Sequence, residues 1–259
     1  MVTTLAEFLP QNHTQSIFRI VRTPALVKGH VLFLQGLFEE LNVNRHAFNQ
    51  ASLIFSRNGF TTTLFDYVGT GDSQGEMGDV EFSQWTQNIT SQISLLRNKD
   101  DKPITIIGFG SAALLLDDEI ISSVDHVQLW HPEVAGTRFI KQMERLALLN
   151  IAHNDVTATS SEHKEVAGYE VSNALWEAIK AVKFSPSPSN KVKVTWFECV
   201  DNKDAALAKV RERQQNQWLD NGRLILIEEQ KYWLSSTLVV PQHLIANSLE
   251  SLLGDTEND

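Results

Sequence analysis

The chain has 259 residues, of which 42% are hydrophobic and 21% are charged, a composition typical of one folded globular domain and unlike that of a disordered chain. Its formal net charge is −10 at pH 7, and no cluster of lysine and arginine stands out in the sequence. Because an acidic surface repels phosphate backbones and anionic lipids, nucleic acids and membrane surfaces are poor candidates for partners.

Strand-like and helix-like segments alternate along the first half of the chain. Apolar or alternating runs predict strands at 16–22, 30–34, 60–65, 104–107 and 124–130. Amphipathic runs predict helices at 44–58 and 82–97, and a third helix is expected at 111–120. The alternation predicts the α/β class, with a mostly parallel central sheet and helices on both faces.

The alternation stops after Gly136. Residues 139–151 form one amphipathic pattern, and residues 154–189 are polar, serine-rich and interrupted by Pro186 and Pro188. We interpret 137–190 as a small cap-like insertion over one end of the sheet, within a single domain that spans 1–259. Strands at 192–197 and 224–227 and helices at 203–218 and 240–253 are expected beyond it.

A tight turn follows the strand at 104–107 and reads Gly108-Phe109-Gly110-Ser111-Ala112. In α/β hydrolases the nucleophilic serine sits on such a turn, in the pattern G-x-S-x-G. Small residues are needed two places before and after the nucleophile, because the strand and helix backbones nearly touch there. The small residues at 108 and 112 therefore put Gly110, which has no side chain, in the nucleophile position. In the competing register the nucleophile is Ser111, and Phe109 occupies a crowded position that favours glycine.

The other members of a Ser-His-Asp triad would follow later in the chain, first the acid and then the histidine. The acid is expected after the strand at 192–197, where Glu198, Asp201 and Asp204 are available. The histidine is expected after the last strand, but residues 228–233 contain none.

Two other histidines are available as a base, but neither is at the expected position. His243 lies inside a predicted helix, and His131 follows a strand that does not normally supply this residue. An activated serine needs a neighbouring base to accept its proton. The nucleophile and the base are therefore missing together from their expected positions, which predicts a degenerate triad.

A polar segment follows the strand at 30–34, at the edge of the sheet where ligands of open α/β folds bind. We predict that it forms a site for a cationic or hydrogen-bonding ligand. The residues assigned to this site are Gln35, Gly36, Leu37, Glu39, Glu40, Asn42 and Arg45. A structural role is the alternative: the two glutamates would favour the start of the next helix through its dipole, and Arg45 would pair with one of them.

A glycine-rich turn runs from Asp66 to Ser73 and is interpreted as structural. Asp66 ends a predicted strand, where its carboxylate can accept hydrogen bonds from backbone amides. Gly69 and Gly71 are expected at positive φ.

These motifs together resemble one branch of the α/β-hydrolase superfamily, the second of two hydrolase-like proteins linked to bacterial exosortase A systems. The resemblance is carried by residues 34–45, the Asp66–Ser73 turn, residues 108–112, and Trp130-x-Pro132-x-x-x-Gly136. It extends to residues 8–10 near the start and to Tyr232-Trp233 and Pro241 near the end. The chain departs from the branch at Gln35-Gly36-Leu37, where prolines and phenylalanine are expected.

The resemblance implies a cytoplasmic accessory of exopolysaccharide production and of the sorting of surface proteins that carry a C-terminal anchor signal. That branch commonly lacks serine at the elbow, as this chain does. The expected partner is an unknown small molecule or protein of the exosortase and exopolysaccharide system.

Two hypotheses follow: a non-catalytic protein that binds a ligand or partner, and a hydrolase that acts on an ester or related acyl substrate through Ser111. We expect no cofactor and no metal, since the single Cys199 allows neither an internal disulfide nor a cysteine-based zinc site. No apolar run reaches the roughly 18 residues that predict a membrane span. Residues 1–10 include no basic residue and do not resemble a secretory signal, so a cytoplasmic location is expected.

Overall fold

The computed structural model describes residues 1–11, 15–151, 162–186, 192–203, 222–235 and 237–256. The strands are β1 (Val2–Pro10), β2 (Ser16–Pro24), β3 (Gly29–Leu34), β4 (Phe60–Phe65), β5 (Ile104–Phe109), β6 (His126–Trp130), β7 (His163–Val166), β8 (Tyr169–Ser172), β9 (Lys193–Val200) and β10 (Gly222–Glu228). The α-helices are α1 (Glu39–Arg57), α2 (Phe82–Arg97), α3 (Asp118–Ser122), α4 (Gly136–Ile151), α5 (Asn173–Ala181) and α7 (Gln242–Thr256). The 3-10 helices are η1 (Met77–Asp79), η2 (Gly110–Leu115) and η3 (Tyr232–Leu234).

The central sheet has eight strands in the order β1-β2-β4-β3-β5-β6-β9-β10. The strands from β4 to β10 in this order are parallel, and β2 and β1 are antiparallel additions at one edge. The predicted mostly parallel sheet is therefore confirmed. The direction of strand order reverses between β3 and β5, so the segments that follow these two strands lie side by side at a position where open α/β sheets bind ligands.

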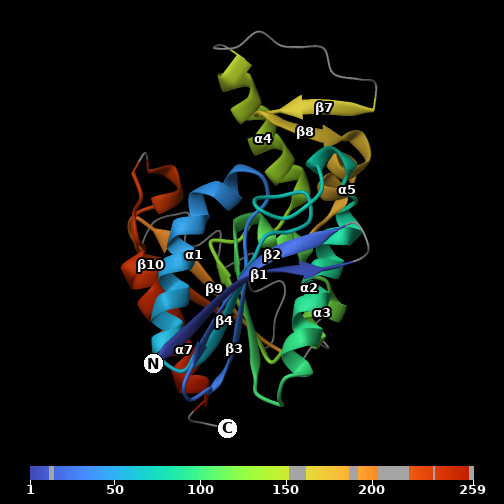
Figure 1. The fold of residues 1–259 in the computed structure, drawn as a ribbon. Coiled ribbons are helices and arrows are strands. Elements are labelled where there is room, and N and C mark those ends of the chain that lie inside the picture. Colours follow the sequence, from blue (N-terminus) through green and yellow to red (C-terminus); the bar gives the residue numbers. More distant parts are fainter. Residues whose placement is uncertain (12–14, 152–161, 187–191, 204–221, 236, 257–259) are drawn as a thin grey trace.

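Helices cover both faces of the sheet (Figure 1) and enclose two apolar cores. The core on one face is built with α1 and α7, and the core on the other face is built with α2, α3, α4 and α5. The strands β3, β4 and β5 are buried over their whole length. Burial on both sides explains why β3 and β5 are almost continuously apolar in the sequence.

Several elements differ from the sequence prediction, and three of them lie before residue 136. The first strand, β1, was not predicted, because as an edge strand it exposes most of its residues and has no clear apolar alternation. Helix α1 begins at Glu39, five residues before the predicted start at residue 44. The predicted helix at 111–120 is wrong: η2 ends at Leu115, and Asp117 caps the separate helix α3 by accepting a hydrogen bond from the amide of Ile120.

Helix α4, the hairpin β7–β8 and helix α5 lie together over one end of the central sheet (Figure 1). The hairpin and α5 fall within 154–189, where the sequence predicted no regular element. Ser172 caps the start of α5, because its hydroxyl accepts a hydrogen bond from the amide of Leu175. The bounds 137–190 for a cap-like insertion stay a prediction.

Most of the predicted helix at 203–218 lies outside the described residues. None of the helices that the structure describes has the length and apolarity that a membrane crossing requires.

Candidate functional site

The turn after β5 has the geometry of a nucleophile elbow. Gly110 has a φ of 54°, as predicted for the residue in the nucleophile position. A Cβ placed on Gly108 would lie 3.4 Å from the Cβ of Ala112, so the strand and the following helix do approach closely at this turn. The Gly110 register is the one that this geometry favours.

The carboxylate of Glu40 fills the space where a nucleophilic side chain would project. A Cβ on Gly110 would overlap the carboxylate of Glu40, and a Cβ on Gly36 would lie 2.5 Å from the Oε2 atom of the same carboxylate. From the sequence, the Cα of Gly110 is expected to face a pocket lined by Gly36, Leu37 and Glu39. Glu40 occupies that space instead, and glycine at both 36 and 110 makes room for it.

Ser111 contacts the carboxylate of Glu40 and is fully buried. Its hydroxyl donates a hydrogen bond to Oε2 of Glu40 at 2.6 Å and accepts one from the amide of Leu37 at 2.7 Å. The amide of Ser111 also donates to Oε2 of Glu40, at 2.7 Å. In α/β hydrolases the oxyanion hole consists of the amide after the nucleophile and an amide from the loop after the third strand. The corresponding amides here, Ser111 and Leu37, both have partners within the protein.

The pKa of Glu40 is raised to about 7, chiefly by burial and to a smaller extent by the nearby carboxylate of Glu133. The two hydrogen bonds from Ser111 lower this pKa but do not offset the loss of hydration. Glu40 therefore changes its charge near neutral pH, where an ordinary glutamate stays ionised.

A cavity of 370 Å³ opens beside Glu40, and its wall includes His131 and Phe109. Helix α4 contributes Phe139, Met143 and Leu146 to the same wall, together with Gln142. The amphipathic helix predicted at 139–151 therefore lays Phe139, Met143 and Leu146 over the cavity beside Glu40. The volume lies within the range of about 300–1,000 Å³ that is usual for small-molecule sites.

His131 and Glu198 form a pair that the sequence analysis did not identify. His131 follows β6 directly and has a φ of 46°, and its Nδ1 atom lies 3.1 Å from Oε1 of Glu198. Its ring packs against Trp233, with 4.3 Å between the ring centroids. Glu198 is fully buried within β9 and also accepts a hydrogen bond from Trp196. Trp130 pairs with Phe197 on the adjacent parallel strands β6 and β9, so the residues that follow them, His131 and Glu198, lie side by side. Only knowledge of this register would have allowed the pair to be predicted from the sequence.

The other triad candidates lie elsewhere. The side chain of Asp201 is 82% exposed and lies 3.8 Å from Lys231. The side chain of His243 is 75% exposed, in the first turn of α7. Neither residue lines the cavity beside Glu40, and Asp204 lies outside the described residues.

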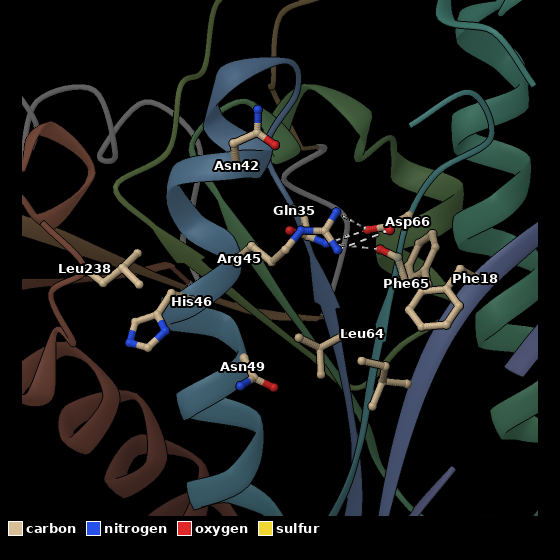
Figure 2. Close-up of a pocket in the computed structure, with 11 residues that line it drawn as sticks. Phe18, Gln35, Asn42, Arg45, His46, Asn49, Leu64, Phe65, Asp66 and Leu238 are labelled. Carbon is tan, nitrogen blue, oxygen red and sulfur yellow. Dashed lines mark hydrogen bonds and ion pairs between the residues drawn. The ribbon is translucent and has the colours of Figure 1, made fainter. Parts of the chain in front are cut away.

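The polar site predicted after β3 is divided in two by helix α1. Glu39 and Glu40 line the cavity described above. Gln35, Asn42 and Arg45 line a second cavity of 420 Å³ between α1 and the strands β2 and β4 (Figure 2). Asn42 also links Glu39 to the hairpin β7–β8, since its amide donates to Oε2 of Glu39 at 3.2 Å and to the hydroxyl of Tyr169 on β8 at 3.0 Å. The seven residues assigned to one site therefore do not form one site.

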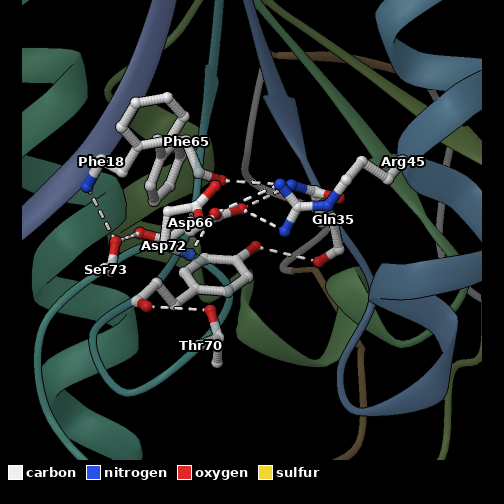
Figure 3. A network of polar contacts seen from close by, with 9 residues as sticks. Phe18, Gln35, Arg45, Phe65, Asp66, Thr70, Asp72 and Ser73 are labelled. Carbon is white, nitrogen blue, oxygen red and sulfur yellow. Dashed lines mark hydrogen bonds and ion pairs between the residues drawn. The ribbon is translucent and has the colours of Figure 1, made fainter. Parts of the chain in front are cut away.

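Asp66 is the centre of a network of buried polar contacts (Figure 3). Its Oδ1 atom accepts hydrogen bonds from Gln35 at 3.0 Å and from Arg45 at 2.9 Å, and its Oδ2 atom accepts one from the amide of Asp72 at 2.9 Å. Its own carbonyl oxygen accepts a bond from the hydroxyl of Ser73. Arg45 therefore pairs with Asp66 rather than with Glu39 or Glu40, which corrects the structural alternative given above.

The positions of the two glutamates and the turn glycines agree with the predicted structural roles. Glu39 and Glu40 are in the first turn of α1, where a negative charge interacts favourably with the positive end of the helix dipole. Gly69 and Gly71 have φ values of 73° and 53°. A Cβ on Gly71 would overlap the carboxylate of Asp66, so the turn is shaped around that side chain. Among the described residues, no group of three or more histidine, cysteine, aspartate or glutamate side chains is placed to hold a metal ion.

Comparisons with known proteins identify the fold. No family model matches the chain, and no curated protein matches it in sequence. The structure is similar to Est1E from Butyrivibrio proteoclasticus, with a TM-score of 0.67 and 12% identity over 98% of this chain and 99% of that one. It is also similar to a proline iminopeptidase from Mycobacterium smegmatis, with a TM-score of 0.65 and 10% identity over 98% and 99% of the two chains.

A third similar structure is the α/β-hydrolase domain-containing protein 10 from mouse, with a TM-score of 0.62 and 13% identity over 97% of this chain and 99% of that one. At such low identities these likenesses concern the fold alone. The predicted α/β-hydrolase fold is confirmed.

Proposed function

We propose that this protein with the α/β-hydrolase fold is non-catalytic and acts as an accessory that binds a ligand or partner at the cavity beside Glu40. The observation that carries the proposal is the position of the Glu40 carboxylate. It fills the space next to Gly110 and accepts the hydrogen bond of the Ser111 amide.

Hydrolysis of an ester needs an open oxyanion hole, because negative charge develops on the substrate oxygen in the transition state. Here the Ser111 amide binds a carboxylate, and the Leu37 amide binds a hydroxyl. An ionised Glu40 would also repel the developing oxyanion. The cavity is suited to retaining a molecule with cationic or hydrogen-bonding groups, since Glu39 and Glu40 lie in a wall that is otherwise largely apolar.

The alternative is a hydrolase that uses Ser111 as its nucleophile. One contact favours it: the Ser111 hydroxyl lies 2.6 Å from a carboxylate whose pKa is about 7, within reach of a general base. The complete burial of Ser111 opposes it, because a substrate carbonyl has no access to the hydroxyl.

Labelling with a fluorophosphonate separates these two functions. We expect no adduct on the parent protein, and a serine protease treated in the same way serves as the positive control. Stoichiometric labelling of Ser111, located by mass spectrometry and lost in Ser111→Ala, would contradict the non-catalytic function.

The resemblance described above supports a cytoplasmic role in exopolysaccharide production and surface-protein sorting with an exosortase. To test this role, the gene is deleted in a bacterium that encodes the chain, and the amounts of exopolysaccharide and of surface-anchored proteins are measured. A plasmid copy carrying Ser111→Ala should restore both, because no nucleophile is required. Normal levels of exopolysaccharide and of surface-anchored proteins after the deletion would contradict the exosortase role. If a plasmid with the parent gene restored them and the plasmid with Ser111→Ala did not, the non-catalytic function would be contradicted.

A further inference from the structure

The cavity between α1 and the strands β2 and β4 has two chemically different walls (Figure 2). Asn42, Arg45, His46 and Asn49 project from α1 and form a polar wall, and Phe18 and Leu64 are among the apolar residues that project from the strands. With a volume of 420 Å³ the cavity is large enough for a small molecule. It is distinct from the cavity beside Glu40, and the two share no lining residue.

Arg22 of β2 lies buried next to this cavity and lacks a compensating charge. Its two terminal nitrogens donate hydrogen bonds to the hydroxyl of Ser52 at 2.7 Å and to Oδ1 of Asn49 at 2.6 Å, and its Nε atom has no partner. In the described part of the chain no carboxylate lies within ion-pair distance of it. Burial lowers the pKa of Arg22, because the charged guanidinium loses hydration. A buried cation without an anionic partner is costly to a protein.

Asn49 connects Arg22 to the cavity. Because Arg22 occupies the Oδ1 atom of Asn49, the amide group of Asn49 is oriented with its NH₂ group free to donate to a molecule in the cavity. Ile20, two residues before Arg22 on the same strand, lines the cavity as well. Alternate residues of a strand share a face, so the guanidinium extends the same wall that Ile20 begins.

The charges around the cavity leave an excess of one positive charge. Arg45 is balanced by Asp66, from which it lies 2.9 Å away. Arg22 is balanced by no carboxylate in the described residues. A ligand with a single negative charge would therefore complete the balance, and the apolar wall calls for an apolar body.

We propose that this cavity binds a small organic carboxylate with an apolar chain. The carboxylate accepts hydrogen bonds from the side chain of Asn49 and lies in the field of Arg22. The chain of the ligand lies against Phe18, Ile20 and Leu64. A dianionic phosphate would exceed the available charge, so the carboxylate is the better match.

Octanoate is the probe for this proposal, and octanamide is its uncharged counterpart. Calorimetric titration of the parent protein should show binding of octanoate and binding at least about tenfold weaker for octanamide. Arg22→Gln keeps hydrogen-bonding capacity but removes the charge, so octanoate should bind about tenfold more weakly to it. Arg57→Gln, at an exposed position of α1, removes the same charge away from the cavity and should bind octanoate as the parent does.

A second variant, Ile20→Trp, fills the cavity and should abolish octanoate binding whatever happens to Arg22→Gln. It also decides the outcome if Arg22→Gln does not fold, which a melting curve of each variant would reveal. Absence of octanoate binding to the parent, equal binding of octanamide, or unchanged binding to folded Ile20→Trp would each overturn the proposal. The serine-labelling result at Ser111 has no bearing on these measurements, so the two proposals fail separately.

Discussion

The two cavities on either side of the start of α1 differ in charge, although one short segment of sequence supplies polar residues to both. The cavity at the elbow receives Glu39, Glu40 and Val43. The cavity beside β2 receives Asn42, Arg45, His46 and Asn49. Residues three, four and seven apart share one side of a helix, so the helical period sorts a mixed polar segment into an acidic and a basic site. Spacing along a helix, rather than closeness in sequence, decides which residues act together.

The largest effect is expected from Asp66→Ala, which removes the partner of Arg45 and Gln35. The loss of a buried carboxylate that accepts several hydrogen bonds should lower the free energy of unfolding by about 2–4 kcal/mol. Urea denaturation measures it, with Asp66→Asn as the variant that keeps the shape. If the α1–β2 cavity is organised separately from the elbow, the pKa of Glu40 should not change in Asp66→Asn. An unchanged denaturation midpoint in Asp66→Ala would show that the turn does not depend on this carboxylate.

Glu40→Gln tests the acidic cavity at the elbow. Because burial raises the pKa of Glu40 from 4.5 to about 7, the unfolded chain loses this proton at lower pH than the folded protein. The folded state is therefore progressively destabilised relative to the unfolded chain as pH rises from about 4.5 to 7, by a total of about 3 kcal/mol.

The difference in unfolding free energy between Glu40→Gln and the parent should thus grow in favour of the variant across that pH window and level off above it. Denaturation curves at several pH values measure this. Glu39→Gln makes the same change at the neighbouring exposed residue and should not reproduce the trend. A difference that stays flat with pH would mean that Glu40 is ionised throughout.

Gly110→Ser tests whether the elbow can be restored. The new side chain would meet the Glu40 carboxylate at a residue with positive φ, so a loss of about 1–2 kcal/mol in stability is expected. Hydrolysis of p-nitrophenyl acetate should stay at background, also in Gly110→Ser combined with Glu40→Ala, because residues 228–233 contain no histidine and the exposed His243 does not line the cavity. Turnover by either variant that disappears in His131→Ala would identify His131 as a base that can serve the elbow.

The smallest effect is expected from Asp201→Asn. The side chain of Asp201 is largely exposed, so the melting temperature of the Asp201→Asn variant should equal that of the parent protein. Glu198→Gln, in contrast, alters a fully buried carboxylate between His131 and Trp196 and should lower the melting temperature. Equal melting temperatures for both variants would show that the pair of His131 and Glu198 adds nothing to stability.

The fold and the state of the elbow were accessible from sequence because they depend on local patterns. The strands β3 and β5 are short apolar runs, and the helices α2 and α4 show helical spacing of apolar residues. The glycine at 110 and the small residues around it predict the positive φ directly, since a close approach of strand and helix leaves few choices. The exposed strand β1 and the broken helix after the elbow were not predicted, because neither has a periodic apolar pattern.

By itself the sequence determined that position 110 has no nucleophile and that residues 228–233, directly after the last predicted strand, contain no histidine, since both are statements about residue identity. Only the tertiary structure decided that Glu40 fills the vacant position and that His131 meets Glu198. It also decided that Arg22 lies buried beside a cavity and pairs with no carboxylate among the described residues. Each of these contacts joins elements that are distant in the chain. Their formation depends on strand register and on the rotation of α1 about its axis, which follow from the packing of the whole sheet and not from any local pattern.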